Sequence, residues 1–462
     1  MTIIPKETEK DYAIIKCCEK FITRFKINEK LRKVGATKEK GFPAYDVYAF
    51  IMGLVFTGKN LYTVLAYAKE RIPFGKDTVY RFLNKASVNW NMFLFVLSID
   101  AVSEIKKLTS DDRRCAIIID DTPYYRDRSK KVELLSCFKD HSENRYYKGY
   151  TLLNMGWSDG QTFIPLDYRI LANADSSKLI EGSHVKEDNR TLATKRRKDA
   201  QTEKPKLVLD MLKSVKGTPA EAKHVLFDSW FSSPSALLSI KRLGYHVVTR
   251  LKDHKNFRYL YKGELLSIRE LYAMHKKRRG KSRYLLSVTV EVRHNDFEES
   301  IPANIIFVRD KNNRGKWIAF LSTDTALSEE DIIALYGKRW DIETFHKVIK
   351  SGLRLEKEFQ TRSYDAVVAH TAIVLSRYIM LSVDSRESRD ERSVCELYYQ
   401  QCKELEDISF AYSYSLIISF IRQGLAERLF MSIKDINAAL EQFLNPLPLY
   451  IKDKLALLVC ES

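Results

Sequence analysis

Two short apolar runs, each followed directly by aspartate, constrain the fold of this chain more than any other feature. Cys115 to Ile119 precedes Asp120-Asp121-Thr122-Pro123, and His224 to Phe227 precedes Asp228. Short continuous apolar runs rich in β-branched residues are typical of buried strands, which occur mainly in α/β proteins. The sequence therefore predicts an α/β core with carboxylates at the ends of two strands.

The segment between the two runs predicts a hairpin and a helix. Gly149 to Trp157 and Thr162 to Ile170 have strand-like patterns and flank Ser158-Asp159-Gly160-Gln161, which is rich in turn-forming residues. A helix is expected around Leu207 to Val215. The predicted order is strand, hairpin, helix and strand.

The residues before about 108 carry helix-period apolar positions and predict a helical N-terminal domain. A helix around Leu61 to Lys69, a turn at Arg71-Ile-Pro-Phe-Gly75 and a helix capped by Asp77 or Thr78 are compatible with a helix-turn-helix. An ordinary helical hairpin with basic residues on its solvent-exposed face explains the same pattern, so both alternatives stay open. Helix-period segments beyond about 364 predict a helical C-terminal domain.

The charge of the chain favours a polyanionic partner. The 462 residues have a formal net charge of +17. Residues 241 to 283 hold fourteen Lys or Arg against three acids, in a segment with strand-like alternation and several tyrosines. We expect a basic, β-rich insertion that contacts the phosphate backbone of a nucleic acid, although a solvated charged face is the simpler alternative.

Several other classes of protein are disfavoured. The seven cysteines show no CxxC spacing and no disulfide-like cluster, and the start of the chain lacks the apolar core of a secretory signal. No apolar run reaches the roughly 20 residues that span a bilayer. We expect a cytoplasmic protein without a membrane partner, and no motif indicates zinc, a dinucleotide or a nucleophilic Ser or Cys triad.

The pattern from Glu329 to Lys350 predicts one helix with a functional face. On a helical wheel of 100° per residue, a sector of about 80° contains six residues, if the helix continues past Gly352: Tyr336, Arg339, Glu343, Lys347, Lys350 and Arg354. One carboxylate among phosphate-binding side chains suits a metal-dependent nuclease. Ordinary i,i+4 ion pairs on a solvated helix would give the same pattern.

The strand-end aspartates also have simpler explanations, since Asp121 precedes a turn-like Thr-Pro and Asp228 can cap the residues that follow it. Taken together with Glu343, they supply oxygen ligands for two hard divalent cations about 4 Å apart. This arrangement serves in-line attack on a phosphodiester. The hypothesis from the residues alone is therefore a metal-dependent nuclease.

The same residues resemble a known family. The spacing Tyr336-x2-Arg339-x3-Glu343-x6-Lys350, within the string Tyr-Gly-Lys-Arg-Trp-Asp-Ile-Glu-Thr-Phe-His-Lys, is similar to the Y-R-E-K motif of the insertion-sequence-four family of bacterial DDE transposases. The blocks Ile119-Asp-Asp-Thr122 and Leu226-Phe-Asp-Ser-Trp-Phe231 also resemble that family. The resemblance covers roughly residues 115 to 380 and includes a β-rich insertion between Asp228 and Glu343.

This resemblance implies an RNase H-like catalytic core, a mixed sheet with helices, interrupted by the insertion. The implied domains are a helical DNA-end-binding domain (1–108), the first part of the core (109–240), the basic β-rich insertion (241–325), the second part of the core with the Glu343 helix (326–363), and a C-terminal helical domain with a possible role in dimerisation (364–462).

The implied catalytic and metal-binding triad is Asp121, Asp228 and Glu343. Asp120 is the alternative first member, and Asp121 is preferred because the family's aspartate typically precedes Thr or Ser. The implied DNA contacts are Tyr336, Arg339, Lys347 and Lys350, together with Trp317, which in some relatives would stack on a flipped base; simple strand packing is the alternative for Trp317. Trp340 is expected in the core.

The function implied is that of an insertion-sequence transposase that binds terminal inverted repeats and catalyses DNA cleavage and strand transfer. Two Mg²⁺ ions, replaceable by Mn²⁺, would serve as cofactors, and a homodimer would act on paired ends of double-stranded DNA near the bacterial nucleoid. The alternatives are a catalytically inactive or domesticated DNA-binding protein, and an RNase H-like nuclease without strand transfer.

Overall fold

The computed structural model describes residues 18–403 with short gaps, and scattered residues between 417 and 442. The gaps are 38–39, 59, 68–73, 141–142, 187, 255, 280–281, 311–312, 314, 360, 389–392 and 395. Residues 71–73 of the predicted turn, and most of the chain beyond 403, therefore lie outside the described residues. The predicted C-terminal helices around 412–421 fall in that part.

Helices form the part of the chain that precedes the sheet, within the residues that are described. They are α2 (Glu19–Arg24), α3 (Ile27–Lys33), α4 (Ala44–Leu54), η1 (Val55–Thr57), α5 (Leu61–Tyr67), α6 (Lys76–Leu83) and α7 (Trp90–Lys107). Asn89 caps α7, because its side chain accepts a hydrogen bond from the Met92 amide. Helix α6 begins at Lys76 with Gly75 as its N-cap, so the predicted cap at Asp77 or Thr78 was wrong.

The strands form one mixed sheet of eleven strands. Their bounds are β1 (Ala116–Tyr125), β2 (Ser136–Asp140), β3 (Arg145–Ser158), β4 (Phe163–Leu171), β5 (His224–Phe227), β6 (His246–Arg250), β7 (Tyr259–Tyr261), β8 (Glu264–Leu266), β9 (Leu286–Val292), β10 (Ile301–Arg309) and β11 (Trp317–Ser322). The order is β2-β3-β1-β5-β6-β11-β10-β9-β7-β8, with β4 paired to β3. Strands β1, β5 and β6 are parallel neighbours, whereas the other pairs are antiparallel.

The predicted α/β class and the predicted hairpin are confirmed. Strands β3 and β4 pair from Ser158↔Phe163 onward, and the turn between them contains Gly160 at φ +86°. A side chain at Gly160 would also collide with Lys338, since an added Cβ would lie 2.9 Å from Lys338 Cε. Glycine therefore serves both the turn and the close approach of that lysine.

Strand β1 is longer than the sequence predicted. It pairs with β5 only up to Ile119↔Phe227, but with β3 as far as Tyr125↔Gly149. The strand was predicted to end within Asp120–Pro123 and instead continues to Tyr125, because the antiparallel neighbour β3 continues past the end of the parallel neighbour. Asp120 and Asp121 lie in an extended strand, and their side chains point to opposite faces of the sheet.

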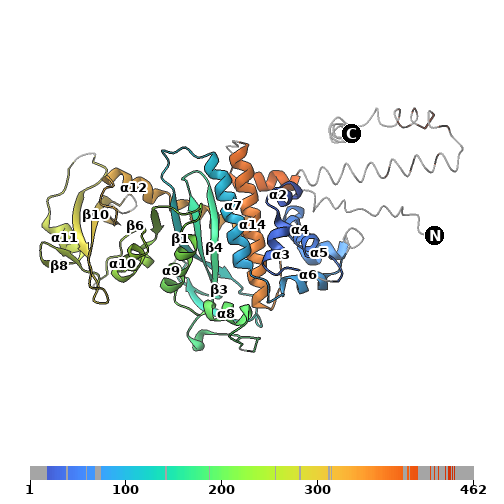
Figure 1. Ribbon diagram of the computed structural model, residues 1–462, viewed down its shortest axis with the longest axis horizontal. Coiled ribbons are helices and arrows are strands. Elements are labelled where there is room, and N and C mark those ends of the chain that lie inside the picture. The colour runs from blue at the N-terminus through green and yellow to red at the C-terminus, as the bar shows by residue number, and fades with distance from the viewer. Residues whose placement is uncertain are drawn as a thin grey trace.

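Helices cover both faces of the central strands (Figure 1). Helix α9 (Lys204–Val215) lies on one side of β1 and β4, and α7 with α14 (Tyr364–Glu387) lies on the other. The remaining helices after the first strand are η3 (Ser176–Lys178), α8 (Leu192–Ala200), η4 (Ser229–Phe231), α10 (Pro234–Arg242), α11 (Ile268–Met274), α12 (Glu329–Gly337) and α13 (Trp340–Ser351). This double cover explains why the central strands are apolar on both faces.

The single helix predicted from Glu329 to Lys350 is divided into α12 and α13. The amides of Lys338 and Arg339 donate to carbonyls three residues earlier, which tightens the chain at the junction. Gly337 precedes this junction and is a poor helix former. The predicted extension to Arg354 was also wrong, because Arg354 has φ +56° and lies beyond the end of α13.

Helix α14 is buried along almost its whole length. By length and composition it could cross a membrane. Its most apolar 18-residue stretch is nevertheless entirely buried inside the protein, as in the core helix of a soluble protein. Arg377 on this helix is 0% exposed and donates to Glu358 at 2.7 and 2.9 Å. It also donates to the carbonyls of Ile51 and Met52, and these hydrogen bonds join α4 to α14.

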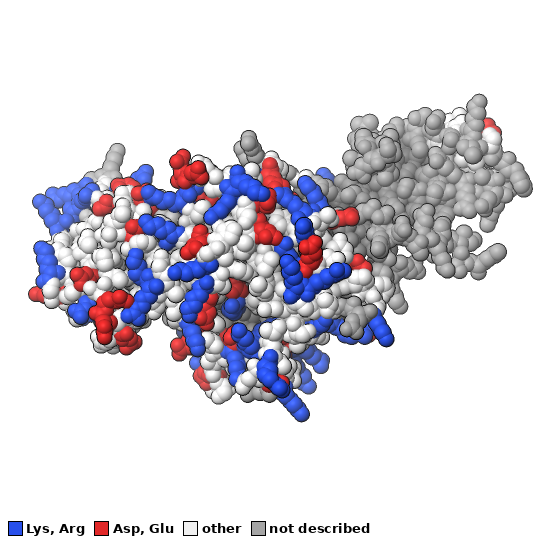
Figure 2. All heavy atoms as spheres, viewed as in Figure 1, with Lys and Arg blue, Asp and Glu red and all other residues white. Residues whose placement is uncertain are grey.

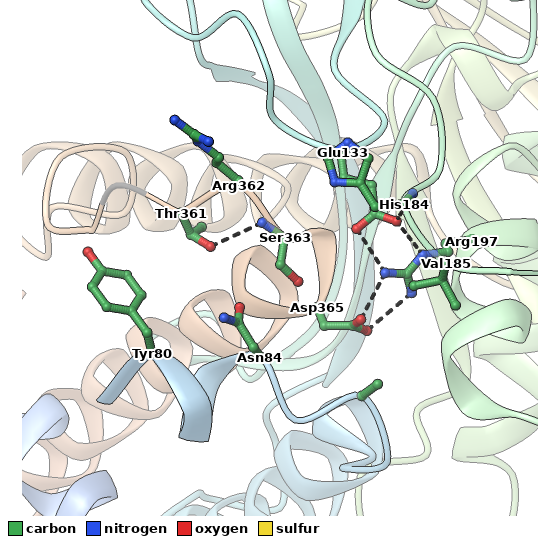
Figure 3. Close-up of a pocket in the computed structure, with 11 residues that line it drawn as sticks. Tyr80, Asn84, Glu133, His184, Val185, Arg197, Thr361, Arg362, Ser363 and Asp365 are labelled. Atoms are coloured by element: carbon green, nitrogen blue, oxygen red, sulfur yellow. Dashed lines mark hydrogen bonds and ion pairs between the residues drawn. The ribbon is translucent and has the colours of Figure 1, made fainter. Parts of the chain in front are cut away.

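A second buried network joins the start of α14 to α8 and to the loop after β1. Arg197 donates to Glu133 and Asp365, which lie on either side of its guanidinium (Figure 3). These three residues line a cavity of about 450 Å³ together with Tyr80, Arg362 and others. Neither the strand-end aspartates nor Glu343 line this cavity.

Replacing Arg377 by methionine (Arg377→Met) is expected to lower the free energy of unfolding by about 3 to 5 kcal/mol, because Glu358 would remain buried without the guanidinium, with only His370 as its side-chain partner. Urea unfolding followed by circular dichroism measures this change. Arg190→Met is the control: its ion pair with Asp188 is exposed, and its loss should cost less than about 1 kcal/mol. Equal effects of the two substitutions would contradict the structural role of Arg377.

Candidate active site

The candidate site begins where β1 and β5 run side by side. The register Ile119↔Phe227 makes Asp120 and Asp228 the next residues along two parallel strands, which are spaced about 4.8 Å apart. Asp228 caps η4, because its carboxylate accepts a hydrogen bond of 2.6 Å from the Ser229 amide. The parallel pairing thus brings two carboxylates to one edge of the sheet.

Helix α13 brings Glu343 and Arg339 to the same face as Asp120. Arg339 Nη2 lies 2.5 Å from Glu343 Oε1, and its Nη1 lies 3.6 Å from Asp120 Oδ2. The guanidinium therefore stands between the two carboxylates. The sequence prediction that Arg339 and Glu343 share a face is confirmed, and that face includes the end of β1.

The electrostatics of Asp120 are those of a buried acid among other acids. Burial raises the pKa of Asp120 to about 7. The carboxylates of Asp121 and Asp228 add to the rise, while the positive charge of Arg339 opposes it. Strongly perturbed carboxyl groups of this kind cluster at functional sites, although structural ion pairs also produce them.

Asp121 does not join this face. Its carboxylate forms an ion pair with Lys204 at the start of α9, on the opposite side of the sheet. The structure therefore places Asp120 next to Asp228 and, through Arg339, close to Glu343, whereas Asp121 contacts Lys204 instead. The difference from the sequence-based preference arises because β1 remains extended through both aspartates, so adjacent side chains alternate between faces.

Lys350 and Tyr336 lie on either side of the carboxylates. Lys350 Nζ donates to Thr122 Oγ1 at 2.8 Å and lies 4.0 Å from Glu356 Oε1. Burial lowers the pKa of Lys350. Burial also raises the pKa of Tyr336 to about 12, so its phenol keeps its proton near neutral pH.

Asn154, which the sequence analysis left out, and His346, which lies beside the functional face of the predicted helix, are in contact next to Asp120. Asn154 is paired with Asp120 across β1 and β3, and its Nδ2 lies 2.9 Å from His346 Nε2 on α13. Burial lowers the pKa of His346 to about 3, so the imidazole is neutral. Asn154 lies beside Asp120 because of the register between β1 and β3, which the sequence did not specify.

Three further residues named in the sequence analysis, Trp317, Lys347 and Trp340, differ in how far they are buried. Trp317 packs inside the insertion, where its ring stacks on Tyr272 at 5.0 Å and meets Phe307 edge-on, as expected for strand packing. Lys347 is exposed on α13. Trp340 is 64% exposed, so the prediction that it lies in the core was wrong.

The donor chemistry suits a hard cation only in part. Asn154 Oδ1 is buried without a hydrogen-bond partner within the described residues, Asp120 lies across from Asn154 on β1, and Asp228 lies on the other side of Asp120. Hard divalent cations prefer such ligands. The described residues nevertheless contain no group of three or more His, Cys, Asp or Glu arranged to hold a metal, since Arg339 occupies the space beside Glu343.

Basic side chains are abundant on the surface around these strands. Figure 2 shows Lys and Arg spread over the visible face and interspersed with acids, including the end that carries α11 and β8. There, Arg278 lies 4.1 Å from the Tyr284 ring centroid and Lys277 lies 4.4 Å from that of Tyr272. The basic segment predicted from the sequence thus has its cations beside aromatic rings.

The fold and this geometry agree with a comparison against protein-family models. Residues 44–288, more than half of the chain, match the family described as DDE superfamily endonuclease. The chain therefore belongs to this family, and its mixed sheet with flanking helices is consistent with a DDE/RNase H-like nuclease core. Nucleases of this superfamily act on DNA and generally use divalent metal ions. The match ends before Glu343, and no curated protein matches the sequence.

The substitution Asp120→Asn is expected to stabilise the protein at neutral and alkaline pH. An unfolded aspartate loses its proton near about pH 4, whereas folded Asp120 keeps it up to about 7. Raising the pH through this window therefore destabilises the wild type, and the variant escapes that loss. The free energy of unfolding of Asp120→Asn should exceed that of wild type by an amount that grows between about pH 4 and 7 to about 2 to 4 kcal/mol and then stays constant.

Urea unfolding in the presence of EDTA, repeated across this pH range, measures the effect. Asp121→Asn is the matched control, because it removes the adjacent carboxylate from an ion pair with Lys204. We expect no comparable gain in that variant. A difference between Asp120→Asn and wild type that does not change with pH would contradict the buried, proton-holding state of Asp120.

Proposed function

We propose that this protein is an insertion-sequence transposase of the insertion-sequence-four type. It would bind the terminal inverted repeats of its element, cleave them in a Mg²⁺-dependent reaction and join the freed 3′-hydroxyls to target DNA. One observation carries the proposal: Asp120 and Asp228 lie side by side along adjacent parallel segments, and the Arg339 guanidinium contacts both Asp120 and Glu343 in a chain of the DDE superfamily. The Tyr336, Arg339, Glu343 and Lys350 spacing supports the subfamily assignment.

The proposed carboxylate triad is Asp120, Asp228 and Glu343, with Asp120 in place of Asp121. These three residues would hold the divalent cation, and the oxygen of Asn154 lies beside the first of them. When bound, the cation would activate the attacking oxygen and stabilise the leaving oxygen. It would also favour the ionised form of Asp120, because a nearby positive charge lowers the pKa of a carboxyl group.

The basic residues of the site would hold the phosphate of the cleaved strand. Arg339 pairs with Glu343 in this structure, and a DNA phosphate is a competing bidentate partner for the guanidinium. Lys350 would supply a second positive charge from the far end of α13. The neutral Tyr336 phenol would donate a hydrogen bond to a phosphate oxygen.

The remaining parts of the chain would bind DNA and hold two protomers together. The basic segment 241–283 would grip the backbone flanking the cleaved end. The N-terminal helices would recognise the element ends, and the C-terminal region, most of which lies outside the described residues, would hold a homodimer on paired ends.

The substitution Glu343→Gln is expected to reduce DNA cleavage by more than about 100-fold, because it removes a carboxylate from the metal-binding set. The substrate is a DNA fragment with the gene's own flanking sequences, incubated with Mg²⁺, with Mn²⁺ or with EDTA. Binding of the same fragment, measured by gel shift, should change little. Glu330→Gln on α12 is the control, since Glu330 is an exposed acid outside the site.

The outcomes separate the proposal from its rivals. Cleavage at the element ends, followed by joining to a second DNA, would support a transposase. Cleavage without joining would favour an RNase H-like nuclease that lacks strand transfer. Tight binding without cleavage by the wild type would favour an inactive or domesticated DNA-binding protein, and cleavage by Glu343→Gln would overturn the triad.

Cleavage also distinguishes the two adjacent aspartates. Asp120→Asn should abolish metal-dependent cleavage, because only Asp120 shares the face of Glu343. Asp121→Asn should retain cleavage to within about tenfold, because its carboxylate contacts Lys204 on the opposite face. The reverse order of activities would return Asp121 to the triad and exclude Asp120.

A further inference from the structure

An exposed tryptophan stands next to the candidate site and takes no part in the chemistry described so far. Trp230 is the second residue after Asp228 and lies in η4, with 64% of its surface exposed. Its neighbour Phe231 is buried and packs against Phe227 in β5, so η4 is anchored to the end of the strand. The anchored backbone holds the large apolar ring of Trp230 in solvent at the edge of the sheet.

Two lysines from different segments flank this ring. Lys204 Nζ lies 5.6 Å from the ring centroid and Lys252 Nζ lies 5.4 Å from it. Lys204 comes from the start of α9, and Lys252 follows β6. An exposed cation–π contact contributes only about 0.5 to 1 kcal/mol, so it does not by itself account for an exposed tryptophan.

Asp121 orients one of the two lysines. Its carboxylate forms the ion pair with Lys204, which holds the ammonium group of that residue near the Trp230 ring. The segment after β5 and the residue that follows β6 thus meet the start of α9 at one aromatic ring with positive charge around it. This gives the second aspartate of β1 a role as a positioning residue.

We propose that Trp230, Lys204 and Lys252 form a subsite for an unpaired nucleotide of the DNA strand next to the cleaved end. The Trp230 ring stacks on the base, and the two ammonium groups bind the phosphates on either side. Bases inside a duplex are covered by their neighbours, so only an unpaired base offers its face to an aromatic ring. The inference rests on the proposed function, which supplies the DNA strand.

The test uses the full-length protein in EDTA, where cleavage does not interfere. The probes are a labelled single strand of about 20 thymidylates and a duplex of the same length, and fluorescence anisotropy gives the dissociation constants. Trp230→Ala should weaken binding of the single strand at least about fivefold and binding of the duplex less than about twofold. Trp230→Phe should stay within about threefold of wild type, because phenylalanine also stacks.

Tyr399→Ala is the matched control, since Tyr399 is a similarly exposed aromatic residue, at 66%, in the helical region after α14. It should leave both affinities unchanged. Lys204→Gln and Lys252→Gln should each lower the salt dependence of single-strand binding by about 0.7 in the log–log slope. Thermal unfolding checks that each variant is folded.

Equal single-strand affinity of Trp230→Ala and wild type would overturn the proposed subsite, as would equal losses on the single strand and the duplex. The cleavage assay with Glu343→Gln tests the proposed function separately. Loss of single-strand binding in Trp230→Ala, with no metal-dependent cleavage by wild type, would retain the subsite and reject the transposase. Metal-dependent cleavage by wild type, with unchanged single-strand binding in Trp230→Ala, would support the transposase and reject the subsite.

Discussion

The parallel pairing of β1 with β5 is the constraint on which the rest of the structure depends. Parallel neighbours need a long crossover, and the chain supplies it with β2, the β3–β4 hairpin, α8 and α9. The hairpin extends the sheet on one side of β1, while β6 extends it in parallel on the other. From β6 the chain continues through β7 to β10 and returns in β11, which pairs with β6 and leads into α12 and α13. The same topology therefore builds the core and returns Glu343 to it.

This arrangement concentrates negative charge where the strands end. Asp120 and Asp228 lie side by side, and burial raises the pKa of Asp120, to which the charge of Asp121 and, to a smaller extent, that of Asp228 add. Arg339 offsets part of that cost, since its guanidinium contacts Asp120 and Glu343 together. Under the proposed function, a cation and a DNA phosphate would satisfy charges that the protein itself balances only in part.

The N-terminal helices are joined to this core by buried polar groups as well as by apolar packing. Burial alone would raise the pKa of Glu358, but Arg377 and His370 outweigh it and hold that pKa below its usual value. Arg377 also donates hydrogen bonds to the carbonyls of Ile51 and Met52 in α4. Such a pair has a specific geometry, so it orients the helices in a way that apolar contacts alone do not.

Much of the fold followed from local pattern. The apolar runs at Ile117–Ile119 and Val225–Phe227, the turn residues around Gly160 and the helical period near Leu207 are all local signals, and each predicted element is present. The shared face of Arg339 and Glu343 also followed from the sequence, since the two residues are one turn apart on a helix. The spacing of Tyr336, Arg339, Glu343 and Lys350 is likewise a property of the sequence alone.

Tertiary structure decided which of these residues meet. Asp120 and Asp121 are adjacent and chemically identical, and only the extension of β1 alongside β3 assigns one to α13 and the other to Lys204 on α9. Trp230 and Trp340 are exposed, whereas Trp317 is packed, because neighbouring elements either cover an aromatic ring or leave it in solvent. Sequence determined the local elements and the residues they carry, because those depend on near neighbours. Faces, partners and burial depend on contacts between distant segments, and these exist only in the folded chain.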